Sequence, residues 1–168
     1  MIFITVGTQL PFDRLLEYFD EWRTEVGYTG KVVAQIGEDS HFSSPLIEIF
    51  KTLSSEQYYY WFCQADGIVS HTGMGSILSC LDHDKRGVFL PRQYALGEHR
   101  NDHQLDTAQA FAGKYPTLEF CADKPAFFSA LNKLIATHDS QVATVDKESS
   151  SELGDNIATY LGIKRPLL

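Results

Sequence analysis

Two short apolar runs, each followed by a polar loop and a helical pattern, constrain the fold of this chain more than any other feature. Gly67-Ile68-Val69 leads into the loop 70–76, and Gly87-Val88-Phe89-Leu90 leads into the polar stretch 91–104. This order is typical of parallel strands that alternate with helices, because each helix returns the chain to the start of the next strand. Loops that follow parallel strands meet at one edge of the sheet, where α/β folds bind ligands. We therefore expect a ligand site built from these two loops.

The remaining apolar patterns extend the same arrangement. Further strands are predicted at 2–6, 31–36, 46–53 and 117–120, and helices at 11–26, 55–65, 98–113 and 124–137. Pro11 is well placed at the start of the first helix. We predict an α/β fold with a Rossmann-like open parallel sheet that helices cover on both faces. The predicted domain organisation is an α/β domain at 1–138, a polar Ser-rich linker at 139–151 and a C-terminal helix and tail at 152–168.

Composition and charge narrow the possible partners. With 14 Lys and Arg against 22 Asp and Glu, the net charge of −8 argues against nucleic acid or an anionic membrane surface as a partner. Cys63, Cys80 and Cys121 are too widely spaced for a metal or redox motif, so we interpret them as free thiols in a reducing compartment. The sequence shows no export signal and no apolar run near the about 20 residues that span a bilayer. We expect a cytoplasmic protein.

The loops after the first and fourth strands carry glycines where a phosphate could approach the backbone. Gly7 follows the first strand, either as a simple turn residue or as part of an anion site at the next helix. In the loop 70–76, Gly73 and Gly75 leave space at a helix N-terminus, and Ser76 adds a hydroxyl. The pattern is neither a P-loop nor the dinucleotide motif. His71 fits a ligand contact or a hydrogen-bonded histidine at a strand end.

The polar stretch 91–104 is dense in hydrogen-bonding groups. Arg92, Arg100 and two histidines stand among acidic and amide side chains, a mixture that suits sugar hydroxyls together with a phosphate. His99 and His103 are four residues apart, so a metal site is an alternative interpretation. Neither a following Glu nor a third ligand with diagnostic spacing supports it. We therefore predict no metal site.

Three of these segments together resemble a known family. They are Thr5-Val6-Gly7-Thr8, the loop 70–76, and Pro91-Arg92 followed by the segment 99–104. In this order they resemble the family 28 glycosyltransferase C-terminal domain, over residues 1 to about 136. Within it the chain is most similar to stand-alone catalytic subunits of bacterial exopolysaccharide synthesis. Those subunits are in turn similar to the small subunit of the N-acetylglucosaminyltransferase of dolichol-linked oligosaccharide synthesis.

The resemblance implies one half of a GT-B glycosyltransferase fold with a UDP-sugar donor site. It implies a partner subunit that supplies the other half, the membrane anchor and a lipid-linked acceptor site, so that the chain is peripheral at the membrane. It implies a metal-independent transfer without a cofactor, with His71 and His103 as the candidate catalytic residues. A non-catalytic nucleotide-sugar-binding or interaction subunit is the alternative. The predicted substrate-binding residues are Gly7, Thr8, Gln9, His71, Gly73, Met74, Gly75, Ser76, Arg92, His99, Asn101, Asp102, His103 and Gln104.

The chain departs from the family pattern at two places. Ser79 stands where the family commonly has a Glu that binds both ribose hydroxyls, and the serine side chain is too short for a bidentate contact. Losing one charge-assisted pair of hydrogen bonds weakens binding by ~1.5–3 kcal/mol. Asp84 and Arg86 replace the usual Gly and Pro before the next strand. The first departure affects donor affinity, whereas neither affects the expected fold.

Overall fold

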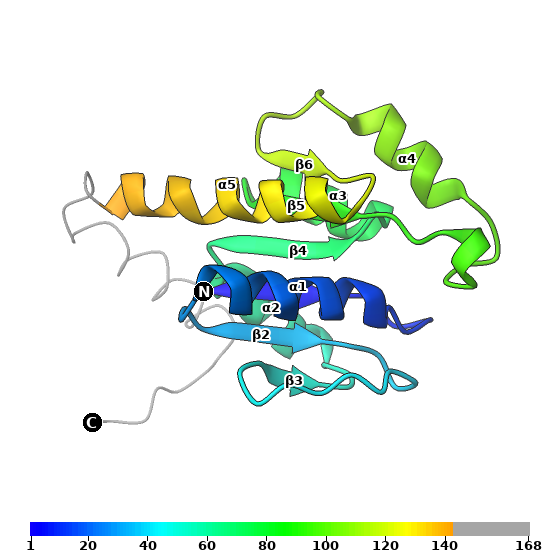
Figure 1. Cartoon of the computed structure of the whole chain (residues 1–168), viewed down its shortest axis with the longest axis horizontal. Helices are drawn as coiled ribbons and strands as arrows, with labels where there is room; N and C mark the ends of the chain where they lie inside the picture. The colour runs from blue at the N-terminus through cyan, green and yellow to red at the C-terminus, as the bar shows by residue number, and fades with distance from the viewer. Residues whose placement is uncertain (143–168) are drawn as a thin grey trace. The chain divides into compact units, whose positions relative to one another are not determined.

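A six-stranded parallel sheet forms the centre of the protein (Figure 1). The computed structural model describes residues 1–142 of the 168-residue chain, of which 1–136 form one compact unit. The strand order is β3-β2-β1-β4-β5-β6, and every neighbouring pair is parallel. The strands are β1 (Ile2–Thr5), β2 (Val32–Gln35), β3 (Glu48–Phe50), β4 (Gly67–His71), β5 (Arg86–Leu90) and β6 (Leu118–Phe120). The predicted Rossmann-like sheet is confirmed.

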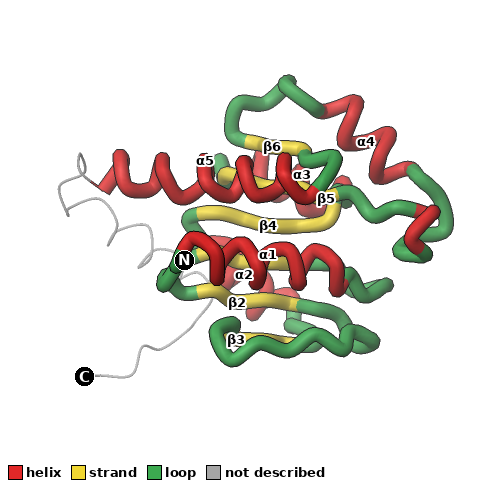
Figure 2. The backbone as a smooth tube through the Cα atoms, in the orientation of Figure 1, coloured by secondary structure: helices red, strands yellow, loops and turns green. Residues whose placement is uncertain are grey.

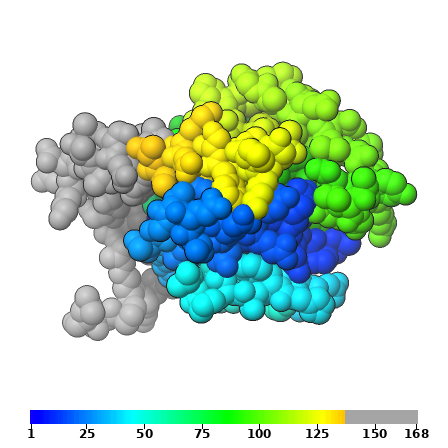
Figure 3. Space-filling view, in the orientation of Figure 1, coloured from blue at the N-terminus to red at the C-terminus, as the bar shows by residue number. Residues whose placement is uncertain are grey.

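Helices cover both faces of the sheet. The helices within residues 1–142 are α1 (Asp13–Val26), α2 (Ser55–Gln64), α3 (Met74–Asp82), the short 3-10 helix η1 (Tyr94–Leu96), α4 (His103–Phe111) and α5 (Lys124–Val142). In Figure 1, α1 and α5 cross the near face, whereas α2 and α3 lie behind the sheet. The space-filling view shows α1 and the first turns of α5 in contact (Figure 3), and the Trp22 indole donates to Asn132 Oδ1 at 2.8 Å between them.

Alternation along the buried strands separates two apolar clusters. Ile2 and Ile4 of β1 pack towards α1 and α5, and Phe3 packs towards α2 and α3. This two-sided burial is the reason that the strands appear in the sequence as continuous apolar runs. The predicted apolar stripe of the first helix lies in the core, with Leu15, Leu16, Phe19 and Trp22 all buried together with Phe12 just before it.

The direction of chain progression reverses between β1 and β4. From β1 the chain proceeds outward through β2 to β3, then returns to β4 on the other side of β1. The helix after β1 therefore lies on one face and the helix after β4 on the opposite face. Such a reversal leaves a crevice at the carboxyl ends of the two strands, which is the usual ligand site of an open α/β sheet. Figure 2 shows the long loops that follow β1, β2 and β5 at this edge.

Several predicted boundaries differ from the structure. The first helix begins at Asp13, because Phe12 has φ −144° and ψ 60°, outside the helical region. The fourth long helix begins at His103 instead of near residue 98, since Gly97 takes φ +70° and ends the preceding turn. Helix α5 continues to Val142, four residues into the predicted linker. The rest of that linker and the predicted tail at 152–168 lie outside the described residues.

Other expectations concern the membrane and the cysteines. Within residues 1–142, no helix combines the length and the apolar character that a membrane crossing requires. All three cysteines are free thiols. Cys80 and Cys121 are buried, and burial raises the pKa of each thiol to about 12, so neither is a reactive thiolate at neutral pH. Cys63 is only partly buried.

Candidate functional site

The loop after β1 lies at the reversal point of the sheet. Thr5 ends the strand, and its hydroxyl donates to Gln35 Oε1 of β2 at 2.9 Å. Gly7 follows with φ +80°, a conformation that residues with a Cβ rarely adopt. A Cβ at this position would also lie 3.0 Å from Cε1 of His71 on the neighbouring strand. Gly7 is therefore required for the turn and for the close approach of the histidine ring.

The second loop packs around the same histidine. A Cβ at Gly73 would lie 2.3 Å from Nε2 of His71, so the absence of a side chain there makes room for the imidazole ring. Gly75 differs, because a Cβ there would meet no atom within 4 Å. Of the two glycines that the sequence singled out, Gly73 accommodates a protein side chain and Gly75 borders open space.

Helix α3 begins in this loop with free backbone donors. Gly73 is the N-cap residue, and no side chain caps the first turn. The first amides of a helix have no intrahelical acceptor and carry partial positive charge, which favours an anion. Ser76 is buried, and its hydroxyl lies 3.0 Å from that of Ser70, which in turn donates to Thr5 O at 2.7 Å. The helix N-terminus is thus fixed to the strands beside it.

Arg92 holds the first loop through hydrogen bonds to its backbone carbonyl groups. Its side chain is only 3% exposed, and Nη2 donates to Val6 O at 2.7 Å and to Leu10 O at 2.6 Å. The guanidinium also lies over the ring of Phe12, 5.1 Å from its centroid. Burial lowers the pKa of Arg92 to about 10, which still leaves the group charged at neutral pH. Nε is buried without a hydrogen-bond partner. Arg92 therefore positions the first loop and places a positive charge next to it.

This charge affects His71. Burial, and then the positive charge of Arg92, lower the pKa of His71 from 6.5 to about 4. The imidazole is consequently neutral at pH 7 and holds one proton. Its Nδ1 lies 3.3 Å from Ser70 Oγ. A bound anion near the ring would raise this pKa, because an opposite charge favours the protonated form.

The third loop is held by contacts to α1 and to the end of β5, together with contacts of its own. Glu98 accepts from Arg14 of α1 at 2.5 Å and 2.8 Å, and also from the Gln93 amide at 2.9 Å. Gln104 is 8% exposed, and its Oε1 accepts from the Arg92 backbone amide at 3.1 Å. The loop is therefore fastened to α1 through Glu98 and to the end of β5 through Gln104.

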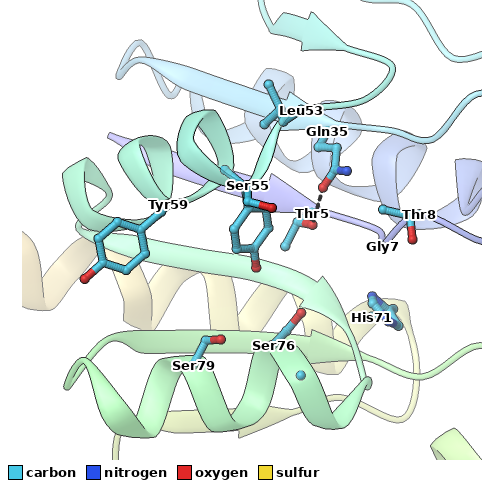
Figure 4. Close-up of a pocket in the computed structure, with 12 residues that line it drawn as sticks. Thr5, Gly7, Thr8, Gln35, Leu53, Ser55, Tyr59, His71, Ser76 and Ser79 are labelled. Atoms are coloured by element: carbon cyan, nitrogen blue, oxygen red, sulfur yellow. Dashed lines mark hydrogen bonds between the residues drawn. The ribbon is translucent and has the colours of Figure 1, made fainter. Parts of the chain in front are cut away.

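Two adjoining cavities occupy this edge of the sheet. The first, which we name the tyrosine cavity, has a volume of about 470 Å³ (Figure 4). It is lined by Thr5, Gly7, Thr8, Gln35, Leu53, Ser55, Tyr58, Tyr59, His71, Gly75, Ser76 and Ser79. The second, the arginine cavity, has about 380 Å³ and is lined by Val6, Gly7, Thr8, Gln9, Leu10, His71, Gly73, Met74, Gly75, Arg92, His99 and Gln104.

The two cavities share one wall. Gly7, Thr8, His71 and Gly75 line both of them, so the N-terminus of α3 stands at their junction. The two sides differ in chemistry. The tyrosine cavity offers hydroxyl groups and two aromatic rings, and the arginine cavity offers a guanidinium, two imidazoles and two side-chain amides. An elongated ligand with an anionic middle matches this arrangement.

Most of the predicted substrate-binding residues lie together at these cavities. Three do not line either one. Asn101 and His103 interact within the loop, where Asn101 Oδ1 accepts from the His103 amide at 3.3 Å, and Asp102 accepts from the Tyr94 amide at 2.9 Å. The His103 side chain is 77% exposed and lies 3.8 Å from Asp106. Of the two candidate catalytic histidines, only His71 lines the cavities.

The far side of the tyrosine cavity was not predicted from the sequence as part of the site. Leu53 lies in the loop between β3 and α2, and Ser55, Tyr58 and Tyr59 lie in the first turns of α2. Gln35 ends β2. The available signal was the position of Gln35 and Leu53 at the carboxyl ends of the predicted strands 31–36 and 46–53, and of Ser55, Tyr58 and Tyr59 at the start of the helix that follows. Their aromatic and hydroxyl groups were interpreted only as part of a helix. In the described part of the chain, no three His, Cys, Asp or Glu residues form a metal-binding group.

The fold and the site define a Rossmann-like domain with a ligand crevice at its switch point, the architecture of the donor-binding half of GT-B glycosyltransferases. The family model of the glycosyltransferase family 28 C-terminal domain matches residues 1–157, and the chain belongs to this family.

Solved structures agree with this fold. The solution structure of ALG13 superposes with a TM-score of 0.54 at 17% identity, over 94% of this chain and 93% of that one. A glycotransferase of kitacinnamycin gives a TM-score of 0.54 at 17% identity over 79% of this chain. This chain spans only 34% of the kitacinnamycin protein, about a third of its length. Among curated proteins, no sequence matches the chain.

Proposed function

We propose that this chain is the donor-binding, catalytic subunit of a glycosyltransferase that uses a UDP-sugar. The product is a sugar attached to a lipid-linked acceptor in bacterial exopolysaccharide synthesis. The observation that carries the proposal is the pair of cavities that meet at Gly75 and the N-terminus of α3. Their shared wall suits a diphosphate, and each cavity suits one of the two groups that a nucleotide-sugar attaches to it.

The diphosphate lies against the uncapped amides of α3, with the positive charge of Arg92 beneath the neighbouring loop. In the transfer, an acceptor hydroxyl oxygen forms a bond to the anomeric carbon, and the bond from that carbon to the UDP oxygen breaks. Negative charge then develops on the leaving diphosphate. Helix amides and the guanidinium stabilise this charge without a metal ion. Nearby anionic charge also raises the pKa of His71 above its value of about 4.

The chemistry of the linings orients the donor. The nucleoside occupies the tyrosine cavity, where Leu53, Tyr58 and Tyr59 provide apolar and aromatic surface for a base. The sugar occupies the arginine cavity, where His99 and Gln104 offer hydrogen bonds to its hydroxyl groups. His71 contacts the diphosphate between them. We place the general base that takes the acceptor proton on the partner subunit, which carries the acceptor site.

The partner supplies the second half of the GT-B fold, the membrane anchor and the acceptor site, and the chain is peripheral at the cytoplasmic face. A second candidate function is nucleotide-sugar binding without catalysis. Two observations favour it. Ser79 brings no carboxylate into the tyrosine cavity, and Gln104 already uses its carbonyl oxygen to hold the Arg92 amide.

Binding and turnover separate the two candidates. UDP at about 100 times its dissociation constant should raise the free energy of unfolding of the full chain by about 2.7 kcal/mol, and a metal chelator should not reverse the shift. UDP release from UDP-glucose, UDP-galactose, UDP-glucuronate and UDP-N-acetylglucosamine is then measured with the partner and a polyprenyl-linked acceptor. Turnover supports the enzyme, and binding without turnover supports the binding subunit. No stabilisation by millimolar UDP would refute both.

A further inference from the structure

The tyrosine cavity is lined by neutral groups alone. Its polar side chains are hydroxyls, one amide and one imidazole, and no Asp, Glu, Lys or Arg is among its lining residues. The imidazole of His71 is neutral as well, because burial lowers its pKa to about 4. Figure 4 shows Ser76 and Ser79 of α3 on one side of the cavity, opposite Ser55 of α2.

The buried polar groups of this cavity have hydrogen-bond partners within the protein. The Thr5 hydroxyl donates to Gln35 Oε1 at 2.9 Å, and the Ser76 hydroxyl lies 3.0 Å from that of Ser70. Among the described residues, the buried side-chain atoms that lack a hydrogen-bond partner are Thr72 Oγ1 and Arg92 Nε. Neither residue lines the tyrosine cavity. In the empty protein, the cavity therefore contains no buried polar side-chain atom that lacks a partner.

Ser79 lies where it could form a hydrogen bond to the ribose of a bound nucleotide. It lies four residues after Gly75 on α3, which places it about 6 Å further along the helix axis. That distance corresponds to the single pentose that separates the diphosphate from the base. The Ser79 side chain is half-buried and lines the cavity. Its one neutral hydroxyl cannot bind both hydroxyls of a ribose as a carboxylate can.

A site distinguishes ribose from 2′-deoxyribose strongly in two cases. In one, a charged acceptor binds the 2′-hydroxyl, which contributes about tenfold to a hundredfold in affinity. In the other, loss of the ligand hydroxyl leaves a buried protein group unpaired. The tyrosine cavity offers no charged acceptor and, in the empty protein, no buried polar group without a partner. A single neutral hydrogen bond to the 2′-hydroxyl contributes only about fivefold.

We propose that this site accepts 2′-deoxyribonucleoside diphosphates nearly as well as ribonucleoside diphosphates, and that Ser79 is the residue that determines this tolerance. The donor class therefore includes deoxyribonucleoside diphosphate sugars. The inference rests on the proposed function, because it requires the nucleoside to occupy the tyrosine cavity.

Calorimetric titration of the full chain with UDP and with 2′-deoxy-UDP tests the proposal. The wild-type dissociation constants should agree within about fivefold. Ser79→Glu introduces a carboxylate on a helix that tolerates Glu well, so it should favour UDP over 2′-deoxy-UDP by at least about tenfold more than the wild type does. Ser79→Ala is the matched control and should leave the ratio near that of the wild type.

The possible outcomes distinguish a failure of this inference from a failure of the proposed function. If the wild type binds UDP but prefers it over 2′-deoxy-UDP by more than about fivefold, the inference is wrong and the donor site stands. An unchanged ratio in a folded Ser79→Glu variant that still binds UDP would show that Ser79 does not face the pentose, and would also overturn it. If neither nucleotide binds the wild type, the proposed function fails and the inference fails with it.

Discussion

Alanine substitutions at Gly73 and Gly75 should have opposite effects on stability. At Gly73, the added Cβ would lie 2.3 Å from Nε2 of His71, and the backbone there (φ −98°, ψ 136°) is one that alanine adopts without strain. The steric conflict alone should therefore destabilise Gly73→Ala by about 1–3 kcal/mol. At Gly75, nothing lies within 4 Å of the added Cβ, and the residue is in the first turn of α3. Gly75→Ala should stabilise the protein by about 0.5–1 kcal/mol.

Gly75→Ala should weaken ligand binding although it stabilises the empty protein. The open space beside Gly75 belongs to the wall that the two cavities share, where we place the diphosphate. A methyl group there should weaken UDP binding by at least about tenfold, while the empty protein becomes more stable. Gly75→Val, with its branched side chain, should abolish the binding of UDP and UDP-sugar together.

Urea denaturation with and without UDP measures both effects on the same samples. The stability of the empty Gly75→Ala variant is the internal control for correct folding. If that variant is stabilised and still binds UDP with wild-type affinity, the diphosphate does not pass over Gly75 and the reasoning is refuted. If Gly73→Ala is as stable as the wild type, the imidazole of His71 is not confined by that glycine.

Three further outcomes are expected. Gln104→Ala should lower the free energy of unfolding by about 1–3 kcal/mol in urea denaturation, because it leaves the buried Arg92 backbone amide unpaired. The same variant should weaken UDP-sugar binding more than UDP binding. Equal losses of affinity for the two ligands would contradict a contact between Gln104 and the sugar. Glu98→Gln should lose about 2 kcal/mol in the same assay because it breaks the largely buried bidentate pair with Arg14, and an unchanged stability would show that the pair does not hold the loop. Because the pKa of His71 falls from 6.5 in the unfolded chain to about 4 in the fold, its stabilising contribution is present above pH 6.5 and is lost as the pH falls towards 4. The free energy of unfolding should therefore fall by up to about 3 kcal/mol more in the wild type than in His71→Gln over that range, and parallel pH profiles would contradict this.

The sequence alone was sufficient to predict the alternation of strands and helices and the edge at which the site lies. Buried parallel strands are short continuous apolar runs, and their glycine-rich and polar loops must meet at the carboxyl edge of the sheet. These are properties of local composition and chain direction, so neither depends on knowing which side chains touch. For this reason the loops at Gly7 and at 70–76 were expected at this edge, and in the structure both line the two cavities.

Only the tertiary structure decided what each residue of the site does. Arg92 was predicted as a ligand residue; the structure adds that its Nη2 donates to Val6 O and Leu10 O and so holds the first loop. Gly73 appeared to make room for a phosphate, yet the space belongs to His71.

The residues that line the tyrosine cavity could likewise not be assigned to the site from the sequence alone. Tyr58 and Tyr59 lie on α2 and face the crevice only because β3 pairs with β2 on the far side of β1. The physical reason is common to all these residues. A pattern along the chain fixes which groups arrive at an edge, whereas the partner of each group is chosen by contacts between segments that are far apart in sequence.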